Sequence, residues 1–487
     1  MLATKAMRGA GWLIISRFAG RGIDFLTLLL LTRVLTPADF GLAALAISLV
    51  VVTDSILDVP ITQALLRLPE IDRTHLDTAF TLGCIRNCLL ATIILCAAWP
   101  FSLFNHNLAL MPLVSVLAIA PVVRGLYSPA MVHFTRRLGF GQTFVMEFSG
   151  KFCAFIAAAV TVYSGGSYWA IAANFVTTSV AATFASYLLA PYWPRYSLAR
   201  LSDFRGIIGW FNTAQVISAL NWQFDRFYIG IAADNNALGR YAVAADVSII
   251  PLQSLIGPAL QPTMAAFAQI VTDTERLKIA FLKTTRVAML IAVPIAVGIS
   301  ITSDLVIDIL FGAKWEEAAP ILRILSIALI PAVFFQNIYS VCVALNRPFI
   351  LFRLNSIDFF IKICLFPLGF YIDYITGVAF ARLTLSIIML LIYIREVSRI
   401  LSIGIAVQLR GIWKMFASGV VMGAVVMALR QESTSFGWSH LLELVFVSCV
   451  GGFVYFLALF LLGVRAFIGK GRVELSDVVN PIARWIR

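Results

Sequence analysis

The chain is built from apolar runs of about 20 residues, and no other feature constrains its fold as strongly. In hydrocarbon every backbone N–H and C=O must be satisfied within the protein, so only helices and closed barrels cross a membrane. These runs are continuous and do not alternate over about 10 residues as barrel strands do. Composition agrees, because 60% of the residues are hydrophobic and only 13% are charged. We predict an all-α polytopic membrane protein.

Hydropathy predicts about fourteen transmembrane helices, joined by links too short to hold a soluble domain. Their centres lie near Phe18, Leu49, Leu90, Leu117, Phe155, Phe175, Ala219, Ile256, Ile295, Ser326, Ile361, Ser386, Val420 and Phe453. The first apolar run continues past Leu31, which is too long for the core of a cleavable signal peptide. We therefore interpret it as the first span.

Basic residues alternate between the two sides of the predicted spans. If the N-terminus is cytoplasmic, the inner segments carry 24 lysines and arginines, whereas the outer loops carry four: Arg33, Arg240, Lys314 and Arg430. This positive-inside bias predicts that both termini are cytoplasmic. It also accounts for the net charge of +12 without nucleic acid, because the basic residues form no single patch.

A weak internal repeat relates the two halves of the chain at a shift of 198 residues. It places Gly11-Trp12 on Gly209-Trp210, Gly41 on Gly239, Ala44 on Ala242, Pro60 on Pro258 and Gln63 on Gln261. Six predicted spans separate the copies, so both enter the membrane in the same direction, as in transporters made of two parallel repeats. We predict six-helix lobes at 1–205 and 206–400, then two added helices and an amphipathic cytoplasmic tail in 401–487.

Several arginines fall inside predicted spans, where a charge is costly and normally faces a cavity or a partner. They are Arg17 and Arg21 in the first span, Arg86 in the third and Arg124 in the fourth. The planar guanidinium group donates two parallel hydrogen bonds to a phosphate and stays protonated. We interpret these arginines as a binding site for a pyrophosphate. The alternative is that they form interhelical salt bridges or extend to the membrane surface.

Acidic residues share the same spans and are candidates for coupling transport to protons or sodium ions. They are Asp24, Asp54, Asp58 and Asp225. Asp24 follows Arg17 and Arg21 at helical spacing, so the three share one face of the first span. Structural ion pairing is the alternative for each of these acids.

Catalytic motifs are missing from the sequence. Around Gly469-Lys470 the first glycine and the Ser or Thr of a phosphate-binding loop are lacking, so we expect no ATP-driven transport. There is no H-E-x-x-H or G-x-S-x-G motif, and no predicted outer loop has the length of a catalytic domain. We expect a protein that is not an enzyme, with no catalytic residues, metal site or bound cofactor.

Specific stretches resemble bacterial oligosaccharide flippases. These are Gly11-Trp12, the run Leu31-Thr32-Arg33-Val34-Leu35-Thr36-Pro37, Asp39-Phe40-Gly41, Asp225-Arg226, Leu310-Phe311-Gly312, Lys314-Trp315 and the run from Ala319 to Leu325. The chain resembles the polysaccharide-transporter branch of the multidrug/oligosaccharidyl-lipid/polysaccharide exporter superfamily over nearly its whole length. Within that branch it is most similar to the colanic-acid and succinoglycan exporter type.

The resemblance implies a protein of the bacterial inner membrane that flips undecaprenyl-diphosphate-linked oligosaccharide units by ion-coupled alternating access. Its partners would be the lipid-linked oligosaccharide, membrane lipids and a polysaccharide polymerase or export complex. Two alternatives stay open: a multidrug efflux pump of the same superfamily, which would favour acidic cavity residues, and a lipid II flippase.

Overall fold

The structure is a computed structural model that describes residues 2–59, 61–68, 70–137, 139–207, 210–433, 438–464, 466–469 and 472–475. Its helices are α1 (Leu2–Val34), α2 (Pro37–Ile56), α3 (Ile61–Arg67), α4 (Arg73–Phe104), α5 (Leu110–Leu117), α6 (Ile119–Gly125), α7 (Val132–Arg136), α8 (Phe140–Tyr163), α9 (Trp169–Leu189), α10 (Trp210–Ala232), α11 (Asn235–Gln269), α12 (Thr274–Ile301), α13 (Ser303–Phe311), α14 (Ala319–Ala328), α15 (Ile330–Ala344), α16 (Pro348–Leu401), α17 (Ile405–Ser433) and α18 (His440–Leu461). Three 3-10 helices are η1 (Pro129–Met131), η2 (Leu201–Ile207) and η3 (Ala313–Ala318).

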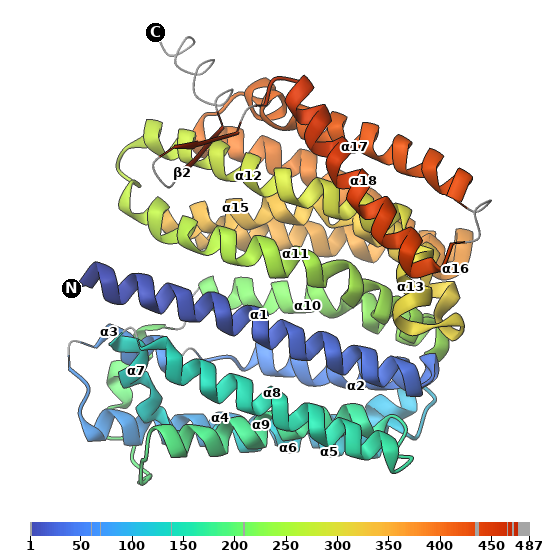
Figure 1. The fold of residues 1–487 in the computed structure, drawn as a ribbon. Coiled ribbons are helices and arrows are strands. Elements are labelled where there is room, and N and C mark those ends of the chain that lie inside the picture. Colours follow the sequence, from blue (N-terminus) through green and yellow to red (C-terminus); the bar gives the residue numbers. More distant parts are fainter. Residues whose placement is uncertain are drawn as a thin grey trace. The chain divides into compact units, whose positions relative to one another are not determined.

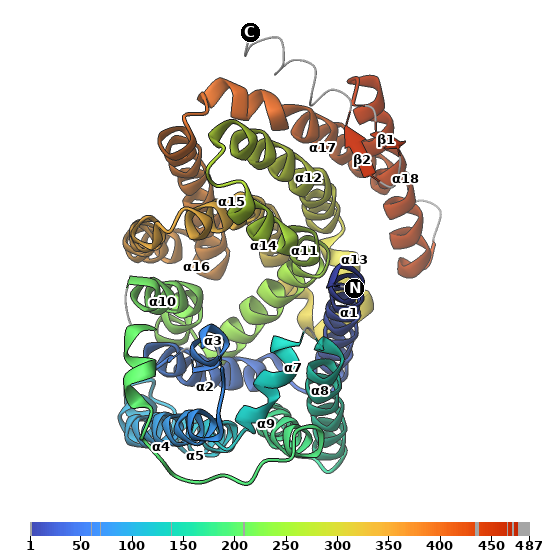
Figure 2. The same ribbon diagram turned by 90° about the vertical axis from the view of Figure 1, so that its left-hand side faces the viewer.

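The chain divides into two compact units. Unit 1 contains Met1–Ala242 and Phe352–Phe359, and unit 2 contains Val243–Leu351 and Phe360–Arg487. In unit 1 the long helices α1, α2, α4, α8 and α9 run side by side, and Figure 2 views them nearly end on. In unit 2, α17 packs against both α12 and α18. The lobes predicted from the repeat, with their limits at residues 205 and 400, stay predictions.

The predicted membrane helices are confirmed as a class. Every predicted centre lies inside a helix. Among the described residues, nine helices have the length and hydropathy to cross a membrane, or ten if Leu110–Gly125 and Pro129–Arg136, bent by 59°, form one span. The protein is therefore an all-α multi-pass membrane protein, and the total of about fourteen spans stays a prediction.

Helix α16 contains two predicted centres because it is a helical hairpin. Its 54 residues are interrupted at Asp373 and Tyr374, whose backbone angles are not helical. After this break Gly377 lies directly against Gly369, and a Cβ added to Gly377 would come within 1.9 Å of the Gly369 carbonyl oxygen. The two arms therefore run antiparallel, in close backbone contact that only glycine permits.

Two further parts of the prediction have different outcomes. A short antiparallel hairpin of β1 (Ala466–Gly469) and β2 (Arg472–Leu475), with Ala466 opposite Leu475, follows α18 and departs from the all-helical pattern. The amphipathic tail predicted over residues 478–486 lies outside the described residues. The other elements of the described residues are helices, so the fold class is unchanged.

Helix α2 begins at Pro37 with a capping box, close to the repeat glycine Gly41. Thr36 caps the helix: its Oγ1 accepts from the Asp39 N–H at 3.3 Å, and the Asp39 carboxylate accepts from the Thr36 N–H at 2.9 Å. Pro37 occupies the first turn, where its missing N–H costs nothing. Ser167 donates a further hydrogen bond to Asp39 at 2.6 Å.

The two repeat-related glycines Gly41 and Gly239 meet where α2 crosses the start of α11 within unit 1. A Cβ on Gly41 would lie 1.9 Å from the Asn235 carbonyl oxygen, and a Cβ on Gly239 would lie 1.8 Å from the Pro37 carbonyl oxygen. The 198-residue shift that relates Gly41 to Gly239 also relates Pro37 to Asn235. The contact is therefore reciprocal, as at a two-fold axis, and it supports the internal repeat.

We expect Gly41→Ala and Gly239→Ala each to destabilise the protein by about 1–3 kcal/mol, because the added methyl group has to push two backbones apart. Gly452→Ala in α18 is the matched control, since a Cβ there meets nothing within 4 Å. Thermal unfolding in detergent micelles measures the difference. Equal unfolding temperatures for all three variants would contradict the close crossing.

Candidate functional site

Arg86 on α4 is the centre of a charged cluster with the end of α2. Its Nη2 lies 2.7 Å from Asp54 Oδ1 and 3.4 Å from Asp58 Oδ1. Its Nε donates to the Leu57 carbonyl at 2.7 Å, and Nη2 also donates to the Asp54 carbonyl at 2.9 Å. Because these carbonyls are at the C-terminus of α2, Arg86 satisfies backbone acceptors and the negative end of the helix dipole.

Arg124 on α6 uses the other oxygen of the same carboxylate. Its Nη1 lies 3.1 Å from Asp54 Oδ2, so Asp54 bridges Arg124 and Arg86. The two arginine side chains differ in exposure, which is 45% for Arg124 and 15% for Arg86. Arg86 is therefore enclosed by its partners, whereas Arg124 presents much of its guanidinium group outward.

A second cluster joins α1 to α8. Asp24 Oδ2 lies 2.5 Å from Lys151 Nζ and 3.9 Å from Arg21 Nη1. Lys151 follows Glu147 by one turn in the sequence, yet it reaches across to α1 and also donates to the Gly20 carbonyl at 3.4 Å. Arg21 is 42% exposed. Arg17 is placed on α1, but its side chain lies outside the described ones.

A third cluster is buried between α2, α10, the start of α11 and residues 352–359 of α16, all in unit 1. Asp225 accepts a hydrogen bond from the Tyr241 hydroxyl at 2.9 Å. One turn earlier on α10, the Asn221 amide donates to Asp358. Ser48 of α2 donates to the Gln223 amide oxygen at 3.1 Å. Asp225 is thus one of two carboxylates in a buried polar region.

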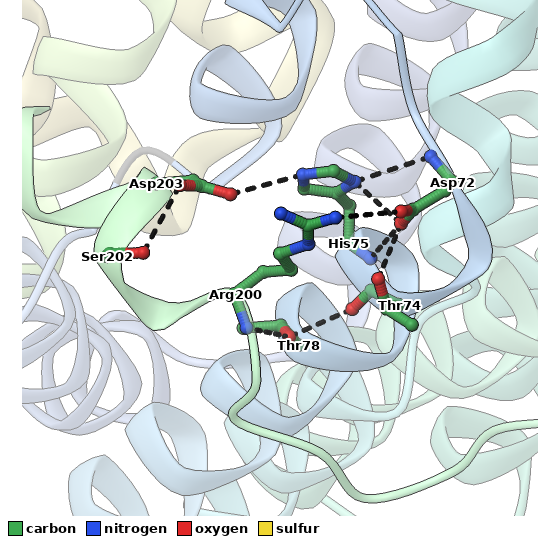
Figure 3. A network of polar contacts seen from close by, with 7 residues as sticks. All are labelled: Asp72, Thr74, His75, Thr78, Arg200, Ser202 and Asp203. Carbon is green, nitrogen blue, oxygen red and sulfur yellow. Dashed lines mark hydrogen bonds and ion pairs between the residues drawn. The ribbon is translucent and has the colours of Figure 1, made fainter.

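At one end of unit 1, the segment between α9 and α10 is tied to the start of α4 (Figure 3). The His75 ring lies 2.6 Å from Asp72 through Nδ1 and 3.2 Å from Asp203 through Nε2. Asp72 also faces Arg200 at 3.5 Å. The Thr74 hydroxyl and the His75 backbone N–H donate to Asp72 and hold the pKa of its carboxyl well below the usual range.

In unit 2, Arg430 connects α17 to α13 and α18. It binds Asp304 in a bidentate manner, with N–O distances of 2.9 and 2.5 Å, and lies 3.4 Å from Glu443. Burial raises the pKa of Asp304, but the hydrogen bonds and charge of Arg430 outweigh this effect and lower it. His440 pairs with Asp308 at 2.6 Å on the same surface. This cluster fastens the two added helices to their neighbours.

The structure groups the predicted residues into three sets. Four of them, Arg86, Arg124, Asp54 and Asp58, form one cluster, Arg21 and Asp24 form another, and Asp225 belongs to the third. Sequence reasoning missed the neutral polar residues on the same helix as Asp225 because it searched for charges. The alternation Asn221, Gln223, Asp225 within an apolar helix was the available signal.

Comparison with known proteins gives the family. Residues 30–320 match the family model described as "Polysaccharide biosynthesis protein". The chain is 23% identical to the lipopolysaccharide biosynthesis protein WzxC of Escherichia coli, over 80% of each chain. It is also 23% identical to the teichuronic acid biosynthesis protein TuaB of Bacillus subtilis, over 97% of this chain and 99% of that one.

The fold is also similar to that of a solved transporter. The structure entitled lipid II flippase MurJ, inward closed conformation, superposes with a TM-score of 0.75 and covers 94% of this chain and 98% of that one. The sequences are only 13% identical, so this similarity concerns the fold alone.

We expect Arg86→Gln to destabilise the protein by about 3–5 kcal/mol, because it leaves enclosed carboxylates without their cation. Arg124→Gln removes a half-exposed partner of the same Asp54 and is expected to cost no more than about 1 kcal/mol. The two variants therefore serve as controls for each other in thermal unfolding of the purified protein. A larger effect at Arg124 than at Arg86 would contradict the assignment.

Proposed function

Since the chain belongs to the polysaccharide biosynthesis protein family, we propose that it flips lipid-linked oligosaccharide units during the synthesis of a surface polysaccharide. The proposed substrate is an undecaprenyl-diphosphate-linked repeat unit. It moves from the cytoplasmic to the outer leaflet of the bacterial inner membrane, and both termini of the protein lie in the cytoplasm.

The observation that carries this proposal is the presence of partly exposed arginines within segments that the sequence predicts to span the membrane. A diphosphate with an attached sugar does not enter hydrocarbon, so it needs a polar and cationic path. Arg21 on α1 and Arg124 on α6 keep 42% and 45% of their side chains exposed while paired with carboxylates. The lipid tail of the substrate needs no such path and stays in the bilayer.

The clusters suggest a division of roles among the predicted arginines. Arg21 and Arg124, together with Arg17, bind the two phosphate groups, because a guanidinium group donates in pairs to phosphate oxygens. Arg86 is a positioning residue, because it is enclosed by two carboxylates and two carbonyls of α2. It holds Asp54 at the place where Arg124 reaches it.

Sharing of Asp54 offers a route to proton coupling. When the diphosphate binds Arg124, Asp54 loses its ion pair with Arg124 and remains paired with Arg86. A carboxylate in a membrane that loses a cation binds a proton more readily. Substrate binding and proton uptake thereby become linked through one shared side chain, and Asp24 stands in the same relation to Arg21. Asp58 adds a second carboxylate beside Arg86.

A second coupling site is proposed at Asp225. Its carboxylate is buried, accepts from Tyr241 and lies one turn from Asn221, which binds a second carboxylate, Asp358. Protonation or binding of a sodium ion would change the charge of this buried polar region. Each ion would change the free energy of helix packing there and bias alternating access of two six-helix lobes.

Deletion of the gene tests the proposed function. We expect the lipid-linked oligosaccharide to accumulate on the cytoplasmic side and surface polysaccharide to disappear, because the head group has no other way across. Extracted lipids and surface polymer are measured. If deletion changed only resistance to toxic cations, the chain would be a drug efflux pump, and if deletion were lethal, it would be a lipid II flippase.

Variants in the same assay test the arginine site. Arg21→Gln and Arg124→Gln should each lower export at least about tenfold, the factor for loss of roughly 1.4 kcal/mol of phosphate binding, while membrane insertion is unchanged. Arg276→Gln is the matched control, because Arg276 is also paired with an aspartate, at 3.0 Å, and is 76% exposed at the start of α12. Full export by both site variants would remove these arginines from the site.

Ion coupling is tested separately with Asp225→Asn. The asparagine oxygen can still accept from Tyr241, so we expect a folded protein whose transport in proteoliposomes no longer responds to an imposed proton or sodium gradient. Tyr241→Phe removes the hydrogen bond but keeps the carboxylate, and its gradient response should persist. If Asp225→Asn responds as the unmodified protein does, Asp225 has no part in coupling.

A further inference from the structure

The segment that follows α9 is fastened along α4 by one of its faces. The Ser197 N–H donates to the Thr81 hydroxyl at 2.9 Å, and the Arg200 N–H donates to the Thr78 hydroxyl at 3.3 Å. The Tyr192 hydroxyl donates to the buried carboxylate of Asp77. Burial and this hydrogen bond both raise the pKa of Tyr192. Figure 2 shows the segment as a green loop that passes near α4.

Aromatic and ionic contacts complete this attachment. The Phe80 ring lies 6.3 Å from the Tyr192 ring and 5.9 Å from the Tyr196 ring. The Arg73 side chain donates to the Trp193 carbonyl at 3.4 Å. Beyond residue 200, the network of His75, Asp72 and Asp203 holds the start of η2 (Figure 3). The segment is therefore held along its length against one helix.

Much of the side-chain surface of this segment is nevertheless exposed. Trp193 is 83% exposed and Tyr196 is 78% exposed. Arg195 and Leu198 are also exposed. We call the exposed set Trp193, Arg195, Tyr196 and Leu198 the linker face. It presents two large aromatic side chains and one cation. The hydrogen bonds described above, which attach the segment to α4, do not use these three side chains.

The position of the segment along α4 places the linker face near a membrane surface. Helix α4 has 32 residues and is about 48 Å long at 1.5 Å per residue, whereas the hydrocarbon core is about 30 Å thick. The helix therefore extends roughly 9 Å beyond the hydrocarbon at each end if centred. Thr78 and Thr81, which the segment contacts, lie about 7.5 and 12 Å from the start of the helix at 1.5 Å per residue. This depth is the boundary between the head groups and the hydrocarbon.

We propose that the linker face binds anionic phospholipid head groups at the membrane surface. Trp and Tyr are the side chains that favour this depth, since they combine an apolar ring with a polar edge. Arg195 supplies charge complementarity to an anionic head group. The exposed Arg136 and Arg137 lie at the end of α7, whose Val132 packs in one hydrophobic cluster with Leu76 of α4 and Phe204 of η2. This surface goes beyond the proposed transport function and does not use its arginine site.

Fluorescence quenching in liposomes tests the proposal. The chain has 10 tryptophans, so the signal of Trp193 is taken as the difference between the unmodified protein and Trp193→Phe. The quenchers are brominated phosphatidylglycerol and brominated phosphatidylcholine, with bromine near the head group. We expect both lipids to quench Trp193, and phosphatidylglycerol to do so at lower mole fraction. Arg195→Gln should reduce this preference about fivefold, the factor for one arginine near an anionic surface.

One control and two opposing outcomes make the test decisive. Arg276→Gln, an exposed arginine of unit 2, should leave the quenching of Trp193 unchanged. If acrylamide in the water quenches Trp193 and brominated lipids do not, the face is free for a soluble partner and the proposal fails. If the preference for phosphatidylglycerol is absent or survives Arg195→Gln, it also fails. The experiment uses purified protein without substrate, so its failure leaves the proposed flippase function standing.

Discussion

The energetic cost of a charge in hydrocarbon organises the polar side chains of unit 1. A buried ion pair is stable only when nearly all of its hydrogen-bonding capacity is used, because desolvation of both ions has to be offset. Arg86 meets this condition with two carboxylates and two backbone carbonyls. Its carbonyl partners belong to the end of α2, so the same arginine that neutralises Asp54 also terminates a helix. The contacts of Arg86 thus fix the position of α2 against α4 and also balance the charge of the cluster.

Exposure then separates residues that the sequence could not tell apart. Arg86 and Arg124 are both arginines of apolar helices, and both bind Asp54. One is enclosed and the other is half exposed, because Arg86 reaches under the end of α2 whereas Arg124 approaches from α6 at the end of a short helix. A carboxylate shared between a fixed cation and an accessible one is suited to exchange: the accessible cation can change partners while the fixed one keeps the acid in place. The difference in exposure between Arg86 and Arg124, rather than the number of arginines, is the basis for proposing a substrate site here.

The sequence could predict what depends on the solvent and not what depends on tertiary partners. Hydropathy placed every predicted span centre inside a helix, because lipid imposes its requirement residue by residue, independent of the rest of the fold. It could not choose the partner of Lys151, because the local candidate Glu147 lies one turn away and the observed partner Asp24 is 127 residues distant. It missed Asn221 and Gln223, which are neutral, and it could not foresee that a break at Asp373 and Tyr374 would separate the two arms of α16.

The glycine crossing shows how a weak sequence repeat acquires physical meaning. At low identity, the coincidence of Gly41 with Gly239 carries little weight by itself. In the structure Gly41 contacts the carbonyl oxygen of Asn235, and Gly239 contacts the carbonyl oxygen of Pro37. The repeat relates Pro37 to Asn235 as it relates Gly41 to Gly239. Such reciprocity is the signature of an isologous contact, in which residue i meets j and j meets i. The two copies of this short segment therefore meet within unit 1 as the subunits of a symmetric dimer do, and the closeness of the backbones there leaves no room for a side chain. One shared geometric demand thus accounts for glycine at both positions.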